Sequence, residues 1–479
     1  MTDQEASVRI SPRDRRYLEL SNGTPYVPNG LNLVGAPPVE EFAATLERMA
    51  AHRVNYCRVW LNHASLLVER ERTGVFDEAG AADLQRFLAL ARERGIRVKL
   101  CLEYFRDIRA ERQIWSDNLI HHRANGGAFA EQDGVPGTAM LDFMQRPAGV
   151  EHFLRKLQWY RDRVGDDPTV YGWELWNEVN CVGPMWLWAP WTERMLAELK
   201  RLFPRHLSLQ SLGSFDRQEY RAMYGWLVGL GDNDVAQAHR YLDLGAEWDV
   251  CHGPVDVLAA EAVRELQRLG TSRPIILAES GAVEPCHSGP FKLFATDTNG
   301  TLLHDILWTP FMAGAAGAGQ VWFWDRYVAP NDLWWQFGRF AEATAGIDPP
   351  AEGFEPLMVA HPRLRVYVLR GRRTVLIWCR DAANDWRAEL RDGVAPELLT
   401  DAAVDLNAPA WHWQERPRPD LTPLLPAGTD WKARAYDPWA NVWADLAVAH
   451  DVLALPPFRR SLVIRLEAQP GQPSVQTAG

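Results

Sequence analysis

The feature that most constrains this chain is a repeated alternation of short, apolar, β-rich runs with longer helical stretches between about residues 28 and 345. Eight such βα units can be counted, and this repeat is typical of a parallel sheet covered by helices. The expected helices include Val39 to His52, Ala81 to Arg94 and Asp256 to Leu269. The eight expected strands are Asn29 to Val34, Val54 to Trp60, Ile96 to Leu102, Val170 to Trp176, Leu207 to Leu212, Val235 to His239, Pro274 to Glu279 and Gln320 to Trp324.

Eight units fit a closed (β/α)8 barrel better than an open doubly wound sheet, which normally carries a glycine-rich dinucleotide fingerprint after its first strand. The first strand here, from Asn29, has no such fingerprint. The glycine-rich segment Gly314 to Gly319 precedes a strand and lacks the Lys-Ser/Thr pair of a phosphate loop, so we predict a tight helix-to-strand turn there. The sequence therefore predicts an α/β fold with a TIM barrel.

Two further regions and one insertion complete the predicted organisation. The barrel, with an N-terminal strand extension, is expected over residues 1–347, and alternating runs such as Thr374 to Cys379 and Ser461 to Leu466 predict a small β-sandwich over residues 348–470. The sandwich is expected to be structural, and residues 471–479 are expected to be a disordered tail. The longest irregular insertion, residues 103–147, follows the third strand and is predicted to shape the substrate site.

Composition and charge exclude several classes of protein. Of the 479 residues, 47% are hydrophobic and 24% are charged, which is typical of a globular chain, and the N-terminus lacks the apolar segment of a secretory signal, so we expect a cytoplasmic protein. The net charge of −11 argues against nucleic-acid or membrane partners. No cofactor or metal is expected, because the six cysteines lie far apart without the spacing of a zinc site and are interpreted as reduced thiols.

Two glutamates end opposite strands of the predicted barrel. Glu178 follows the fourth strand and Glu279 ends the seventh, and barrel enzymes place their working residues at the carboxyl ends of strands. A retaining glycosidase needs two carboxyl groups about 5 to 5.5 Å apart, one as nucleophile and one as general acid/base. Glu174 lies four residues before Glu178 on the same face but deeper, so we predict that it pairs with an arginine.

The sequence resembles glycoside hydrolase clan A, and most nearly family 5, which contains cellulases, mannanases and exo-β-glycosidases. Five motifs carry the resemblance in the order expected for successive strands. They are Arg58-Val-Trp60, Trp176-Asn177-Glu178, His239-Arg-Tyr241, Leu277-Ala-Glu279-Ser-Gly281 and Trp322-Phe-Trp324.

The resemblance implies a role for each matching residue. Glu178 would be the acid/base and Glu279 the nucleophile, with Arg58 and Tyr241 orienting Glu279. Asn177 would bond the sugar 2-hydroxyl, His239 would lie near the acid/base and Trp324 would stack under the reacting sugar. Where better-known family 5 members carry a histidine after the third strand, this chain has Glu103. Glu103, Asn62 and His63 end strands and are candidate substrate contacts.

These features predict a retaining β-glycosidase acting on an oligosaccharide or glycoside. An exo-acting enzyme or one specific for short oligosaccharides fits the expected cytoplasmic location, and an endo-glucanase or endo-mannanase with an open cleft is the nearer alternative. A non-catalytic sugar-binding barrel would tolerate loss of either glutamate, and a metal-dependent hydrolase would need clustered ligands after the first strand, where this chain has Gly30-Leu-Asn32. Exposed tryptophans among the 22 in the chain could hold a homo-oligomer.

Overall fold

The computed structural model describes residues 2–34, 37–61, 64–69, 74–103, 140–412, 419–420, 424–425, 430–449 and 451–469. The parallel strands of the barrel begin after a small antiparallel sheet of β1 (Val8–Ile10), β2 (Leu18–Leu20) and β3 (Pro25–Tyr26). Five strands then pair in order, β4 (Gly30–Asn32), β5 (Tyr56–Trp60), β6 (Arg97–Glu103), β7 (Val170–Trp176) and β8 (Leu207–Leu209), and β9 (Ala236–Leu242) pairs with β10 (Ile275–Ala282). Nearly every residue of these strands is buried, as expected for parallel strands covered by helices.

A helix follows each barrel strand. They are α1 (Phe42–Ala51), α2 (Glu78–Glu93), α5 (Pro147–Val164), α6 (Met185–Leu202), α7 (Tyr220–Gly229), α8 (Val255–Arg268), α9 (Thr301–Met312) and α10 (Trp335–Thr344), and α4 (Met140–Gln145) precedes α5. Asp77 begins α2 by accepting the N–H of Ala79 at 2.8 Å, and Pro147 occupies the first turn of α5, where its missing N–H costs nothing. Among the described residues, no helix is long and apolar enough to cross a membrane.

The eighth strand is shorter than predicted. Gln320 to Trp324 was expected to be extended, but Val321 alone forms bridges, to Leu31 of β4 and Ser280 of β10, and the chain enters a π-helical turn at Trp324–Val328. These two bridges close the barrel on one side, and hydrogen bonds such as Phe215 N–H to His239 O, at 2.7 Å, join the β8 and β9 segments. The barrel thus has eight βα units, and the predicted turn at Gly314 to Gly319 connects α9 to this short bridge.

Beyond α11 (Pro349–Glu352), the chain forms antiparallel β structure. An eight-stranded sheet has the order β16 (Pro419–Asp420), β15 (Ala410–His412), β11 (Glu355–Val359), β12 (Leu364–Arg370), β13 (Thr374–Asp381), β21 (Ser461–Ala468), β17 (Trp431–Asp437) and β18 (Val442–Leu446). A three-stranded sheet has the order β14 (Ala403–Asp405), β20 (Val452–Ala454) and β19 (Val448–Ala449). Val404 and Leu453 from the small sheet share one apolar core with Val366 and Ile377 from the large one, which makes a sandwich.

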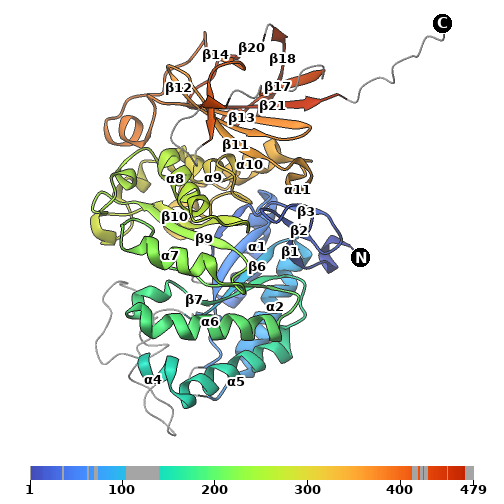
Figure 1. Ribbon diagram of the computed structural model, residues 1–479, viewed down its shortest axis with the longest axis vertical. Coiled ribbons are helices and arrows are strands. Elements are labelled where there is room, and N and C mark those ends of the chain that lie inside the picture. Colours follow the sequence, from blue (N-terminus) through green and yellow to red (C-terminus); the bar gives the residue numbers. More distant parts are fainter. Residues whose placement is uncertain are drawn as a thin grey trace, which may run out of the picture.

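The β-region packs on the barrel helices α8 and α9, as Figure 1 shows at the top of the molecule. Buried ion pairs cross this junction. Arg380 of β13 donates to Asp305 of α9 at 2.8 Å, and Tyr367 donates to Asp256 of α8 at 2.9 Å. Asp256 also pairs with Arg365. Asp305 and Asp256 each pair with an arginine, so neither buried carboxylate at this junction is left without a counter-charge.

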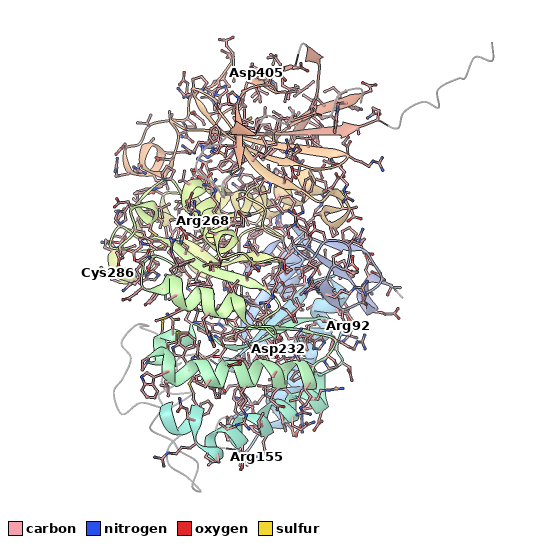
Figure 2. All side chains as sticks on the ribbon, viewed as in Figure 1. Arg92, Arg155, Asp232, Arg268, Cys286 and Asp405 are labelled. Carbon is pink, nitrogen blue, oxygen red and sulfur yellow. The ribbon has the colours of Figure 1, made fainter. Side chains whose placement is uncertain are left out.

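The two ends of the barrel lie on opposite sides of the view. In Figure 2, Cys286, which follows β10, labels the end where strands finish, and Arg92 and Asp232, which precede β6 and β9, label the other end. The carboxyl ends of the strands, where barrel sites are built, are therefore on the side of Cys286.

Candidate active site

The fourth barrel strand carries Glu178 to the mouth of the barrel. All seven residues of β7 are buried, including the inward-facing Glu174. The strand ends at Trp176, and Asn177 and Glu178 follow it. Glu178 adopts a left-handed backbone conformation with φ of 52°, and its N–H donates to Ser211 Oγ at 3.0 Å. Non-glycine residues rarely adopt this conformation, and such residues cluster at functional sites.

Glu279 lies on β10, the seventh barrel strand, which pairs with β9. A register irregularity between Leu277 and Glu279 brings Glu279 level with His239 of β9. One ligand atom from each of Glu178, His239 and Glu279 lies within 4.8 Å of the others, so the two carboxyl groups are close neighbours. Glu178 keeps 14% of its side chain exposed and Glu279 only 3%, which leaves Glu178 as the more accessible of the two.

Arg58, fully buried on β5, connects this pair to a deeper layer. Its guanidinium donates to both oxygens of Glu174, at 2.8 and 3.0 Å, and to one oxygen of Glu279. It also donates to Asn177 Oδ1 at 2.6 Å and to Asn32 Oδ1 at 3.2 Å. Arg58 is therefore in contact both with Glu279, which it was predicted to orient, and with the deeper acid Glu174.

Tyr241 and His239, both on β9, complete the contacts of the pair. The Tyr241 hydroxyl donates to Glu279 Oε2 at 2.8 Å. His239 Nδ1 lies 2.8 Å from Glu178 Oε1 and 3.2 Å from Glu279 Oε2. The residues predicted from four separate motifs therefore lie together in the fold. They are Arg58, Asn177, Glu178, His239, Tyr241 and Glu279.

The environments of the two carboxyl groups separate their proton affinities. Burial raises the pKa of Glu178 well above its usual value, and the nearby charge of Glu279 raises it further. Burial also raises the pKa of Glu279, but Arg58 and the hydroxyl of Tyr241 oppose this effect. A single proton shared by the pair is thus held by Glu178, with Glu279 ionised.

His239 is neutral in this setting. Burial, followed by the positive charge of Arg58, lowers its pKa well below the usual value. The imidazole therefore lies beside both carboxyl groups without adding a positive charge that would ionise Glu178. This keeps Glu178 able to donate a proton.

The cluster of Glu178, His239 and Glu279 has the donor atoms of a metal site, so its chemistry needs a test. Both oxygens of Glu279 already accept hydrogen bonds, one from Arg58 and one from Tyr241. A cation bound there would stand beside a buried guanidinium, with which it would be in electrostatic conflict. The donor set fits acid–base chemistry better than metal coordination.

The other predicted contacts have different outcomes. Glu103, at the end of β6, is fully buried and pairs with Lys156 Nζ at 2.9 Å, which favours a structural role. Trp324 is partly buried at the start of the π-helical turn, and Trp322 packs on Trp60, with ring centroids 5.3 Å apart. Asn62, His63 and most of the insertion at residues 103–147 lie outside the described residues, as does the predicted tail at residues 471–479.

Two residues of the site were not predicted. The ammonium of Lys99, on β6, forms an ion pair with Glu174 Oε2 at 2.7 Å, and Ser211 Oγ donates to the other oxygen of the same acid. A lysine in the wholly buried run Arg97 to Glu103 was the available signal, because a buried ammonium needs an acid partner. Ser211 left no comparable signal in the sequence.

The sequence of the chain is similar to those of several known proteins. No protein-family model matches the chain. The chain is 27% identical over 213 residues to mannan endo-1,4-beta-mannosidase 4 and 28% identical over 230 residues to mannan endo-1,4-beta-mannosidase 3, both from Oryza sativa subsp. japonica. The matches cover 41 and 44% of this chain and 43 and 46% of those proteins, so the chain spans less than half the length of these relatives.

A solved structure has a similar fold. A glycoside hydrolase family 5 protein from Bacteroides vulgatus superposes with a TM-score of 0.58 over 97% of this chain and 94% of that one, at 11% identity. The chain thus shares the fold of a family 5 structure and is similar in sequence to the two rice mannosidases. Its barrel, with an antiparallel β region after it, is the architecture of the family 5 TIM-barrel structures, which confirms the predicted fold class.

Proposed function

We propose that this family 5-like protein is a retaining β-glycoside hydrolase that cleaves within β-1,4-mannan chains. The observation that carries the proposal is the close pair of carboxyl groups, Glu178 and Glu279, held in unequal environments. One oxygen of each lies within 4.8 Å of the other, which supports the short carboxyl separation of retaining enzymes over the roughly 6.5 to 9.5 Å that inverting enzymes need for a water molecule.

The substrate class rests on the relatives. The similar rice proteins are named as endo-acting mannan hydrolases, which favours the open-cleft alternative over the exo-acting reading of the sequence. A carbohydrate polymer is also consistent with the barrel fold shared with family 5.

In the proposed first step, the ionised Glu279 attacks the anomeric carbon while Glu178 gives its proton to the leaving oxygen. Arg58 and Tyr241 hold the two oxygens of Glu279 in position for this attack. Formation of the glycosyl ester neutralises Glu279, so the repulsion that raised the pKa of Glu178 disappears. Glu178 then accepts a proton from water, which hydrolyses the ester.

Asn177 has a defined part in this proposal. Because its Oδ1 accepts the bond from Arg58, the amide nitrogen remains as the donor toward the substrate. We assign it the sugar 2-hydroxyl, where hydrogen bonds strengthen in the transition state. Trp324 is proposed to stack under the reacting sugar, since it follows the last barrel unit and is only partly buried.

The proposal is tested by hydrolysis of β-1,4-mannan, mannopentaose, β-1,4-glucan and a panel of nitrophenyl β-glycosides. We expect mannan and mannopentaose to be cut internally, and Glu279→Ala to lose about 10⁴-fold or more in kcat. Azide should restore turnover of an activated glycoside by Glu279→Ala, giving the glycosyl azide of inverted configuration.

Glu93→Ala is the matched control. Glu93 ends α2 shortly before β6 begins, at the end of the barrel opposite the carboxyl ends of the strands. Its side chain is 68% exposed and pairs with Arg94 at 3.3 Å, so its loss should leave the rate near that of the wild type. Release of single sugars from chain ends would support exo action instead. Retention of most activity by Glu279→Ala would remove the nucleophile assignment.

A further inference from the structure

Three polar side chains outside the proposed chemistry meet at the mouth of the barrel. Ser214 follows β8, Asp243 follows β9 directly, and His287 lies in the short 3-10 turn Pro285–His287 after β10. His287 Nδ1 is 2.9 Å from Asp243 Oδ2, and Ser214 Oγ is 3.2 Å from His287 Nε2. The three loops are therefore tied to one imidazole, next to Cys286, which is labelled at the edge of the barrel in Figure 2.

Asp243 is a firm anchor for this imidazole. Its Oδ1 accepts the N–H groups of Gly245, at 2.7 Å, and of Cys286, at 2.9 Å. Burial acts to raise the pKa of Asp243, but the hydrogen bonds from His287 and these N–H groups outweigh it and lower the pKa. An ionised carboxylate with three donors fixes both the ring nitrogen and the backbone before it.

The backbone at this point is held in an unfavourable conformation. Cys286 and His287 are consecutive non-glycine residues with φ of 61° and 57°. Such residues persist in the left-handed region where surrounding contacts determine their place, and they concentrate at functional sites. Here one oxygen of Asp243 binds the backbone N–H of Cys286 and the other binds the ring of His287. These two contacts fix the orientation of the His287 ring.

That ring is directed at Tyr241. The two ring centroids are 5.0 Å apart at an interplanar angle of 80°, which is an edge-to-face contact. On β10, Gly281 also lies beside the Tyr241 ring, where a Cβ would be in ordinary van der Waals contact with it at 3.5 Å. Tyr241 thus packs against His287 and lies next to Gly281, with its hydroxyl on Glu279 Oε2.

A Ser–His–Asp arrangement also invites comparison with acyl-transfer enzymes. Those enzymes use the N–H of the residue after the nucleophile to stabilise the oxyanion in one common arrangement. Here the N–H of Phe215, which follows Ser214, donates to His239 O at 2.7 Å, and the N–H of Gly213 donates to Asn180 Oδ1 at 2.7 Å. Both neighbours of Ser214 are already bonded, which favours a positioning role.

We propose that the Asp243–His287 pair, steadied by Ser214, is a positioning unit that sets the Tyr241 hydroxyl on Glu279 and thereby aligns the nucleophile. The inference rests on the proposed function, since it assigns Glu279 that role. It predicts that the pair affects the rate of glycosyl transfer to Glu279 and leaves sugar binding nearly unchanged.

The decisive variant is His287→Asn. Asparagine tolerates the left-handed conformation and can place its amide nitrogen near the position of Nδ1, so the bond to Asp243 and the turn are preserved while the ring is lost. With an aryl β-mannobioside, we expect kcat to fall about tenfold with KM within about twofold of wild type, because small misplacements at a reacting centre are costly. Azide should not rescue it, because azide replaces an impaired acid/base or a missing nucleophile and cannot realign Tyr241.

His252→Asn is the matched control. His252 has a side chain 34% exposed, close to the 36% of His287, and its Nε2 contacts Ala246 O at 3.0 Å. Its loss should change kcat by less than about twofold. His287→Phe, which keeps an aromatic edge against Tyr241, should recover part of the lost rate if its thermal unfolding midpoint stays close to that of wild type.

The outcomes separate the inference from the function on which it rests. A wild type that cleaves none of the glycosides removes the proposed function. A His287→Asn variant with wild-type kcat, beside an inactive Glu279→Ala, removes the positioning role alone. A crystal structure of His287→Asn serves as a readout without turnover: a Tyr241 hydroxyl still at its wild-type distance from Glu279 contradicts the inference, and a displaced one supports it.

Discussion

Two layers of the barrel interior hold buried charges in opposite balance. In the lower layer, one acid, Glu174, accepts bonds from two cations, Arg58 and Lys99. At the mouth, Arg58 also donates to Glu279, whereas Glu178 lies against the neutral imidazole of His239. The pKa of Glu174 is accordingly lowered to about 2, because Arg58 and Lys99 outweigh its burial, whereas the pKa of Glu178 is raised.

Burial alone therefore does not make a carboxyl group reactive. Glu174 lies within β7 and is fully buried, and Glu178 follows the same strand and is mostly buried, yet only the one with too few cations has a raised pKa. In the lower layer Glu174 holds Arg58 in place, and at the mouth Arg58 orients Glu279. Breaking one layer at a time should therefore give different kinds of defect.

The largest effect is expected at the mouth. Glu178→Gln removes the proton donor while keeping the shape, and should lower kcat about 10³-fold on substrates with poor leaving groups. The wild-type rate should fall as pH rises through the raised pKa of Glu178, because the acid must be protonated, and fall at low pH as Glu279 gains a proton.

Rate measurements across pH with mannopentaose check this prediction. Glu178→Gln should lose the alkaline limb and keep the acid limb. If both limbs persist in the variant, the acid/base assignment is wrong.

A change to the shared cation is expected to have an intermediate effect. Arg58→Lys keeps a positive charge but cannot reach Glu174, Asn177 and Glu279 together, because an ammonium lacks the planar fork of a guanidinium. We expect kcat/KM to fall about 10²-fold, since both Glu279 and Asn177 lose their orientation. Kinetics on an activated aryl glycoside measure it, and a variant within about fivefold of wild type would show that Arg58 serves the lower layer only.

The smallest effect on activity is expected in the lower layer. Lys99→Met leaves Glu174 with Arg58, so kcat should change by less than about tenfold, while the free energy of unfolding should fall by about 3 kcal/mol because a buried pair has lost a partner. Chemical denaturation at pH 7 gives the second value. A variant with full stability but a large loss of rate would reverse the contrast between the two layers.

The same variant also changes how stability depends on pH. Glu174 has a pKa of about 2 in the folded protein and an unperturbed value of 4.5. A lowered folded-state pKa contributes stability that is present above pH 4.5 and is lost as pH falls toward 2. Lys99→Met raises that pKa, so the loss of stability between pH 4.5 and pH 2 should be smaller in the variant than in wild type.

The sequence predicted those parts of the fold that local patterns determine. Val170 to Trp176 was predicted residue for residue, because an apolar run with one inward acid has a single plausible arrangement as a buried barrel strand. The run Gln320 to Trp324 has equally β-like residues but forms bridges only at Val321. Aromatic residues favour strands through packing on a sheet, and packing of Trp322 and Trp324 around the barrel end sets their conformation instead.

In the site, motifs on separate strands identified the residues that the barrel brings together. The prediction that Glu174 pairs with an arginine is confirmed by its two bonds from Arg58. Lys99 and Ser211 were missed, because their contact with Glu174 depends on the register of neighbouring strands, which no local pattern specifies. The roles of Trp324 and Glu103, the cellular compartment and any homo-oligomer stay predictions.

The bridges at Val321 have a consequence for where the barrel opens. Every other barrel strand forms a ladder of at least three residues with at least one neighbour, whereas this one joins β4 and β10 through one residue and the bonds around it. Local opening begins where cooperative pairing is least, so hydrogen exchange at the backbone of residues 320–324 should outpace that of β6 and β7. The aromatic residues of this run therefore lie on the barrel strand that opens most readily. If a bound sugar chain slows hydrogen exchange there, the sugar stabilises the pairing of this strand with β4 and β10.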